Sequence, residues 1–127
     1  MAIEPDAVRR GAVVVVRVPG DKARPAVVVR SDLLAGLGHA TVLLITSEPR
    51  PDFSLRPDLV PTPENGLRTS SRVMVDWPQT VRLTAMGEVI GHLDAATMQT
   101  ITRQLAIVLG VGSGARRARP RRSRMRT

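Results

Sequence analysis

The sequence predicts a small, mainly β domain, in which a curved antiparallel sheet carries one packed C-terminal helix. Short runs rich in valine, leucine and isoleucine recur up to about residue 93. Each run is too short for a helix but long enough to cross a small sheet. Long proline-bearing connections lie between some of the runs, whereas a doubly wound parallel sheet would need helices there. Only after Asp94 do apolar residues recur every three or four positions, as they do on one face of a helix.

The first two strands are predicted to form a hairpin. Residues 11–20, GAVVVVRVPG, are almost continuously apolar, which indicates a strand buried on both faces. A Pro-Gly-Asp turn follows, and the chain returns in a second strand at residues 25–29. The hairpin tip carries Asp21, Lys22 and Arg24, and such a tip can act as a flap over a ligand. The nine residues before the hairpin are interpreted as a loose lead-in.

A short helical turn leads into the third strand. Ser31 or Asp32 can cap this turn, and the glycines at positions 36 and 38 end it. The third strand is predicted at residues 41–45, TVLLI. Because the connection is short, we expect this strand to run antiparallel to residues 25–29.

This pairing makes Arg24 and Thr46 candidate site residues. Arg24 precedes the second strand and Thr46 follows the third, so antiparallel pairing brings both to one edge of the sheet. A guanidinium beside a hydroxyl is a suitable phosphate site. The alternative is that Arg24 is a surface charge before a proline and Thr46 an ordinary residue at the end of a strand.

The second half of the chain is predicted to hold short strands and the helix. Five prolines lie between residues 49 and 63, so this segment is a loop or an edge passage. Short strands are predicted at residues 71–76 and 80–84, and an extended piece at residues 87–93. The helix is expected to begin after Asp94 and to stop at Gly110. Its apolar face consists of Met98, Ile101, Leu105 and Val108.

Composition excludes several classes of site. The chain has no cysteine, so it forms no disulfide and offers no thiol nucleophile or thiolate ligand. Its two histidines lack the spacing of a metal motif, and no cofactor is expected. Trp77 and Phe53 are the only aromatic residues, so bases are not expected to stack on an aromatic platform. No secretory signal is evident, and the apolar run at residues 106–111 is too short to span a membrane, so the protein is expected in the cytoplasm.

Most of the formal charge of +8 lies at the C-terminal end. Subtracting seven arginines of the tail leaves +1 for all residues before them. We therefore divide the chain into a nearly neutral domain at residues 1–112 and a disordered basic tail at residues 113–127. A basic tail of this kind binds phosphate backbones without reading sequence; the alternative is a solubilising end with no specific use. The seven residues are Arg116, Arg117, Arg119, Arg121, Arg122, Arg124 and Arg126.

Several segments, taken in their order and spacing, resemble the MazF/PemK family of toxin endoribonucleases. They extend over roughly a hundred residues and are RRGxVVVV at 9–16, KxRPAVVV at 22–29, VLLIT at 42–46, ENGL at 64–67, SxVMVDWPQT at 71–80 and GHLD at 91–94. The chain departs from the family pattern at Ala12, where relatives usually carry an aspartate. The tail lies outside the resemblance.

The resemblance implies a small SH3-like barrel shared with CcdB-type toxins, a homodimer, and metal-independent, sequence-specific cleavage of single-stranded mRNA. The products would carry 2′,3′-cyclic phosphate and 5′-hydroxyl ends. It also implies a cognate antitoxin with an acidic, partly disordered segment, for which Lys22, Arg24 and Arg30 would provide positive charge beside the hairpin.

Carried over by position, the resemblance assigns catalysis to Arg24 and Thr46. Arg24 would neutralise charge on the phosphorane, and Thr46 would donate a hydrogen bond to a phosphate oxygen. Glu48 and Asp21 are the acids that can take the 2′-proton. The residues expected to bind RNA are Asp21, Lys22, Ser47 and Gln79.

Two other classes of function remain as alternatives. A CcdB-like topoisomerase poison would share the fold without cutting RNA, but that family relies on a Trp-Gly-Ile terminus and this chain ends Arg-Met-Arg-Thr. A non-catalytic module would bind RNA or the ribosome through its basic tail while the barrel only dimerises. Metal-free cleavage of single-stranded RNA by the purified protein distinguishes an enzyme from both alternatives.

Overall fold

The computed structural model describes residues 3–20, 22–48 and 55–112. Seven strands, three short 3₁₀ helices and one α-helix make up this part of the chain. In order they are η1 (Pro5–Ala7), β1 (Ala12–Val16), β2 (Arg24–Val28), η2 (Asp32–Leu34), β3 (His39–Thr46), β4 (Asp58–Leu59), β5 (Ser71–Val73), β6 (Gln79–Arg82), η3 (Leu83–Ala85), β7 (Met86–His92) and α1 (Ala95–Leu109). The predicted basic tail at residues 113–127 lies outside the described residues.

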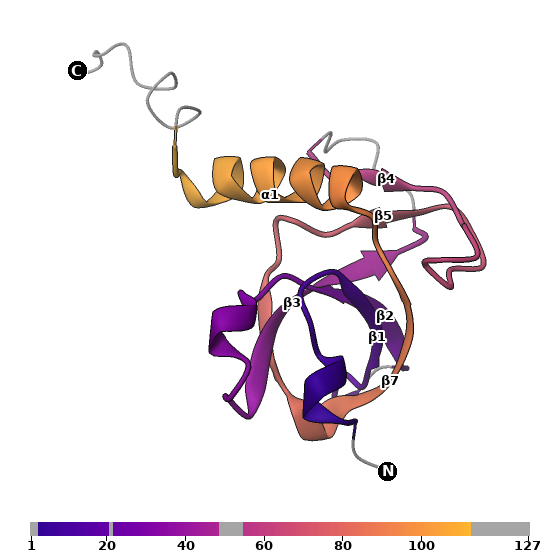
Figure 1. Cartoon of the computed structure of the whole chain (residues 1–127). Coiled ribbons are helices and arrows are strands. Elements are labelled where there is room, and N and C mark those ends of the chain that lie inside the picture. The colour runs from indigo at the N-terminus through magenta and orange to yellow at the C-terminus, as the bar shows by residue number, and fades with distance from the viewer. Residues whose placement is uncertain (1–2, 21, 49–54, 113–127) are drawn as a thin grey trace.

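The strands form one antiparallel sheet that curls into a half-barrel below α1 (Figure 1). Their order is β4-β5-β3-β2-β1-β7, and β6 also pairs with β3. The eight-residue β3 lies at the centre of this arrangement. It pairs with β2 on one side, and on the other side with β6 along its first half and with β5 at its end. The predicted mainly β fold with a C-terminal helix is confirmed.

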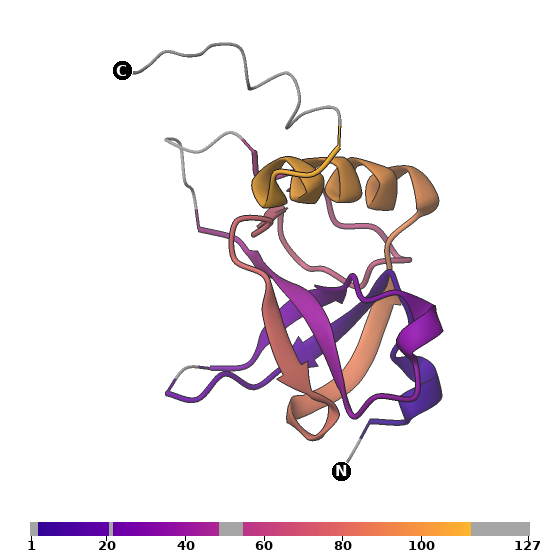
Figure 2. The ribbon, with the colours of Figure 1, turned by 90° about the vertical axis from the view of Figure 1, so that its left-hand side faces the viewer.

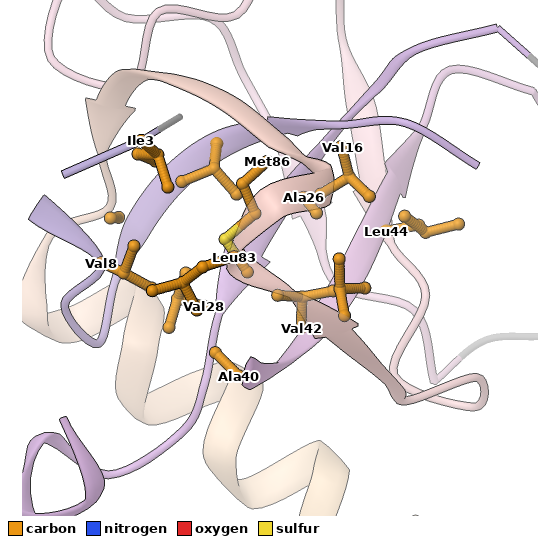
Figure 3. Close-up of a cluster of buried hydrophobic side chains, with 13 residues drawn as sticks. Ile3, Val8, Val16, Ala26, Val28, Ala40, Val42, Leu44, Leu83 and Met86 are labelled. Carbon is orange, nitrogen blue, oxygen red and sulfur yellow. The ribbon is translucent and has the colours of Figure 1, made fainter. Parts of the chain in front are cut away.

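The central strands are buried on both faces, as the run of valines in β1 predicted. Even-numbered side chains of β1, β2 and β3 point into the half-barrel, where they meet residues of β6, η3 and β7 (Figure 3). Odd-numbered side chains of the same strands point toward α1 and pack around Ile101, which is fully buried. Figure 2 shows α1 lying across this second face. Because successive side chains of a strand alternate between its faces, the continuous valine run can fill both cores.

The helix begins and ends as predicted. Asp94 is its N-cap, and one carboxylate oxygen accepts a hydrogen bond of 3.0 Å from the backbone N–H of Thr97. Hydrogen bonds from the side chain and the backbone of Thr97 lower the pKa of the Asp94 carboxyl below its usual value. Gly110 ends the helix in the left-handed conformation, with φ of 72°. None of the helices in the described part of the chain has the length and apolar character needed to cross a membrane.

The prediction of a loose lead-in is wrong for its described residues. Ile3 and Val8 are buried in the half-barrel, and η1 lies between them. Arg30 helps to hold this segment: its side chain is 6% exposed, and it donates a hydrogen bond of 2.5 Å to the carbonyl oxygen of Val8. The N-terminal segment therefore closes one end of the barrel core.

Two predicted strands are shorter than expected. β5 ends at Val73 rather than at residue 76, because a turn follows in which the Trp77 N–H donates to the carbonyl of Met74. β6 covers Gln79–Arg82 rather than residues 80–84, because the chain then enters η3. The proline-rich segment supplies only the two-residue edge strand β4 among its described residues, in agreement with the predicted edge passage. Residues 49–54 of that segment lie outside the described residues.

Candidate functional site

Arg24 and Thr46 lie at the same edge of the sheet, as their positions in the sequence predicted. In the β2–β3 ladder Ala26 pairs with Leu44 and Val27 pairs with Leu43. Continuing this antiparallel register by two residues places Arg24 opposite Thr46. Both residues line a pocket of about 520 Å³, which we call the first pocket. Its polar lining consists of Lys22, Arg24, Thr46, Ser47, Glu48, Arg68, Thr69 and Ser71.

The hydroxyl of Thr46 is held in a defined orientation. Its side chain is nearly buried, with 5% of its surface exposed. Its Oγ1 accepts a hydrogen bond of 3.1 Å from the backbone N–H of Glu48. Because a hydroxyl carries one donor and two acceptor lone pairs, Thr46 keeps its own proton available for a group in the pocket.

The first pocket attracts anions. Lys22, Arg24 and Arg68 contribute three positive charges, and Glu48 contributes one negative charge. The cations belong to two segments, since Lys22 and Arg24 are part of the hairpin and Arg68 follows the turn at residues 63–65. Charges of one sign in a recess raise the local concentration of an oppositely charged ligand. A phosphate group of a nucleic acid is such a ligand.

The wall that carries Arg68 depends on a tightly folded turn. The side-chain oxygen of Asn65 accepts hydrogen bonds of 3.0 Å from the N–H groups of Thr62 and Leu67. At Gly66, where φ is +70°, a Cβ atom would lie 2.1 Å from the carbonyl oxygen of Ile90 in β7. Only glycine fits so close to another backbone, so the ENGL segment places this wall directly against β7.

An ion pair fixes the segment before β4. Arg56 is buried, and its guanidinium binds both carboxylate oxygens of Asp76 at 2.8 and 3.0 Å. Two parallel hydrogen bonds of this kind fix geometry as well as charge. The ion pair therefore anchors the described end of the proline-rich segment to the turn after β5.

The structure brings together some of the residues predicted to bind RNA. Lys22 and Ser47 line the first pocket, and so does Glu48, one of the two predicted candidates for the proton acceptor. Gln79 does not line this pocket. It pairs with Val42 in the β3–β6 ladder, four residues along β3 from Thr46. Asp21 lies outside the described residues.

One further expectation, for Arg30, is wrong, and one residue of the first pocket, Arg68, was not anticipated. Arg30 was expected to offer positive charge beside the hairpin, but its burial and its contacts with the carbonyls of Val8 and His39 make it a structural residue. Arg68 was missed by reasoning from the sequence. Its only signal was its position after the Glu-Asn-Gly turn, and nothing local shows that this turn returns to the sheet edge of Arg24.

The geometry agrees with the family that the sequence matches. Residues 9–109 match the model of a family described as the PemK-like, MazF-like toxin of type II toxin–antitoxin system. The chain is 30% identical over 90 residues to a protein of Mycolicibacterium smegmatis named a probable endoribonuclease MazF, and the match covers 71% of this chain and 83% of that relative.

Solved structures share the fold. Toxin MazF-mt6 of Mycobacterium tuberculosis superposes with a TM-score of 0.69 at 22% identity, covering 80% of this chain and 98% of that one. An endoribonuclease in complex with its cognate antitoxin, from a mycobacterial species, gives a TM-score of 0.69 at 22% identity, with 84% and 97% covered. A MazE–MazF structure from Deinococcus radiodurans gives a TM-score of 0.67 at 19% identity, with 82% and 96% covered.

Proposed function

The chain belongs to the PemK-like, MazF-like toxins of type II toxin–antitoxin systems, and from this premise we propose that it cuts single-stranded RNA at the Arg24–Thr46 edge of the first pocket. The protein is an endoribonuclease of that family. The proposal adds which residues act, that no metal ion takes part, and which ends the products carry. One observation carries it: the β2–β3 register brings Arg24 opposite Thr46 at the mouth of a positively charged pocket.

The reaction needs only the RNA and groups of the protein. The 2′-oxygen of one nucleotide attacks the adjacent phosphorus, and the bond from phosphorus to the 5′-oxygen breaks. The 2′-proton passes to a base, and the departing 5′-oxygen takes up a proton. The products are a 2′,3′-cyclic phosphate and a 5′-hydroxyl. Since the nucleophile is part of the substrate, the enzyme has to align the groups and stabilise charge.

Arg24 and Thr46 suit the two tasks at the phosphate. The guanidinium of Arg24 stays charged at all relevant pH values and offers several donors to the phosphorane oxygens. The Thr46 hydroxyl accepts from Glu48 N–H and donates to a phosphate oxygen. Glu48 lines the same pocket. We assign its carboxylate as the base that accepts the 2′-proton. Lys22 and Ser47 hold the strand nearby.

A cleavage assay with purified protein tests this reaction. Single-stranded RNA should be cut in the presence of EDTA, and the products should carry cyclic phosphate and 5′-hydroxyl ends. A substrate with deoxyribose at the cut position should resist cleavage, because it lacks the attacking oxygen. Loss of activity in EDTA that magnesium restores, or cleavage of the deoxy substrate, contradicts the mechanism.

We extend the proposal to partners and location. A homodimer in the cytoplasm would meet mRNA there, and an acidic segment of a cognate antitoxin would occupy the first pocket in place of RNA phosphates. Lys22, Arg24 and Arg68 are the cations that such a segment would meet. RNA and an antitoxin peptide should therefore compete; simultaneous binding to one site with neither affinity reduced contradicts this arrangement.

The tail forms a separate part of the proposal. We propose a toxin domain at residues 1–112 and an arginine-rich tail at residues 113–127. The family match ends at residue 109, and the seven arginines of the tail follow it. The tail would add affinity for RNA backbones in general, without selecting a sequence.

A further inference from the structure

Thr46 has a second arginine beside it, on the side away from Arg24. In the β3–β5 ladder Thr46 pairs with Arg72, and in the β4–β5 ladder Arg72 pairs with Asp58. Directly opposed residues of neighbouring antiparallel strands project from the same face, about 5 Å apart. Arg24, Thr46, Arg72 and Asp58 therefore form one row across the sheet, in which Thr46 lies between two arginine residues.

A second pocket lies along this row. Its volume is about 390 Å³, and it shares Thr46, Ser47, Glu48 and Ser71 with the first pocket. Of these two pockets, only the second is lined by Asp58 and Arg72. A nucleotide chain whose phosphate contacts Thr46 in the first pocket therefore has room for a neighbouring group in the second.

The charges of the two pockets differ in sign. The first pocket has three cationic side chains and one carboxylate, whereas the second has one cation, Arg72, and two carboxylates, Asp58 and Glu48. A phosphate is attracted to the first and repelled by the carboxylates of the second. The second pocket thus suits the uncharged part of a nucleotide, its base.

The Arg72–Asp58 pair still has hydrogen-bonding groups to offer. Nε of Arg72 donates to Oδ1 of Asp58 at 3.1 Å. This contact leaves the terminal nitrogens of Arg72 as donors and Oδ2 of Asp58 as an acceptor. The two side chains are 34% and 80% exposed, so a ligand in the pocket can reach them. Val60, which is 69% exposed, lines the same pocket and offers apolar contact to the face of a base.

We propose that this second pocket reads one base next to the scissile phosphate and selects a keto base, guanine or uracil, through Arg72 and Asp58. This inference rests on the proposed cleavage at Thr46. Guanine presents O6 beside N1–H, and uracil presents O4 beside N3–H, so each offers an acceptor to Arg72 and a donor to Asp58. In the same orientation, adenine and cytosine present the reverse order, so that their amino donor would face Arg72 and their ring-nitrogen acceptor would face Asp58. Single-stranded RNA exposes these edges for such contacts.

The test maps cut sites and then varies the bases beside them. Cleavage of a random-sequence RNA, followed by sequencing of the new ends, defines the cut position. Matched oligonucleotides then carry each of the four bases on either side of the cut. At one of these positions the wild-type protein should prefer guanine or uracil over adenine and cytosine, by about tenfold to a hundredfold in kcat/KM.

Variants and base analogues assign that preference to the pocket. Arg72→Gln and Asp58→Asn should each reduce the preference about tenfold at that one position. Arg103→Gln, on an exposed residue of α1 away from both pockets, should leave it unchanged. With the wild-type protein, inosine should replace guanosine when guanine is preferred, whereas 2,6-diaminopurine should be cut as poorly as adenine. When uracil is preferred, N3-methyluracil should be cut as poorly as cytosine.

Several results overturn the inference while the proposed function stands. One such result is a wild-type protein that needs Arg24 to cut RNA but favours adenine or cytosine on both sides of the cut. Active variants of Arg72 and Asp58 can keep the full preference, or the analogues can be cut equally. A wild-type protein that cuts no RNA contradicts the proposed function itself.

Discussion

The hydroxyl oxygen of Thr46 accepts a hydrogen bond of 3.1 Å from the backbone N–H of Glu48, and this contact determines what the hydroxyl can still do. This bond uses one of the two acceptor lone pairs of the oxygen and leaves its proton to be donated to another group. Thr46→Ser keeps the hydroxyl and should retain most activity. Thr46→Val keeps the shape but removes the donor, and it should lower kcat about a hundredfold. Single-turnover cleavage rates measure both; equal rates for the valine variant and the wild type contradict a role for the hydroxyl.

Charge and geometry at Arg24 can be separated. Arg24→Ala should lower kcat/KM on the order of a hundredfold or more, because it removes a cation that acts mainly in the transition state. Arg24→Lys keeps the charge but loses the fork of donors, so it should recover only part of this loss. Arg17→Ala is the matched control, since Arg17 is exposed on the same hairpin and does not line the first pocket. If Arg17→Ala is as inactive as Arg24→Ala, the loss comes from the overall positive charge of the hairpin and not from a specific role of Arg24.

Arg68 should contribute to binding more than to chemistry. It lines the first pocket from a different segment than Arg24, so we expect it to contact a phosphate beside the scissile one. Arg68→Ala should raise KM severalfold with little change in kcat, and it should reduce the slope of log K against log salt by about 0.7. Steady-state kinetics and filter binding at several salt concentrations measure these effects. A fall in kcat alone contradicts the assignment.

Gly66 should matter for stability because of the space around it. Both Gly66 and Gly20 have positive φ, but a Cβ at Gly66 would meet the Ile90 carbonyl at 2.1 Å, whereas nothing lies within 4 Å of one at Gly20. Gly66→Ala should therefore lower the free energy of unfolding by about 1–3 kcal/mol more than Gly20→Ala. Urea denaturation of both variants measures the difference. Equal losses would mean that the backbone strain at positive φ accounts for the whole effect.

Truncation after Gly112 tests the tail. Removing seven arginines should weaken non-specific RNA binding. It should also reduce the slope of log K against log salt by about 0.7 for each phosphate that the tail neutralises. The cut sequence should not change, because phosphate contacts position the chain and base contacts specify it. Mapping cut sites for both proteins checks this, and an altered sequence would show that the tail takes part in recognition.

The fold and the central pair of the site were predictable because they depend on short-range patterns. Valine-rich runs separated by a short connection favour antiparallel pairing, and that pairing alone puts Arg24 and Thr46 at one edge. The burial of the N-terminal segment was not predictable, because Ile3 and Val8 are isolated apolar residues that belong to no repeating apolar pattern. Their burial depends on the open end of a barrel that only the whole chain creates.

The rest of the site depends on contacts between distant segments. Arg68 and Arg72 lie more than 20 residues from Thr46 along the chain, and no local pattern connects them to it. Arg68 reaches the pocket because Gly66 lets its turn pack on β7. Arg72 lies beside Thr46 because β3 pairs with β5 only at its last residues. Arg30 shows the opposite error, in which an arginine beside a strand was interpreted as exposed although it binds buried carbonyls.

Thr46 is the last residue of β3, the strand that pairs with three others, and this position links the candidate site to the central strand of the sheet. Among the described strands, the edge strand β4 pairs only with β5, so its local opening leaves every pairing of β3 intact and does not dismantle the pair of Arg24 and Thr46. Segments that open at low free energy have few buried contacts, and β3 is nearly fully buried from Ala40 to its end. We therefore expect the enzyme to have no partly unfolded state of low free energy in which it is inactive. A molecule that occupies the pocket would restrain such an enzyme without unfolding it.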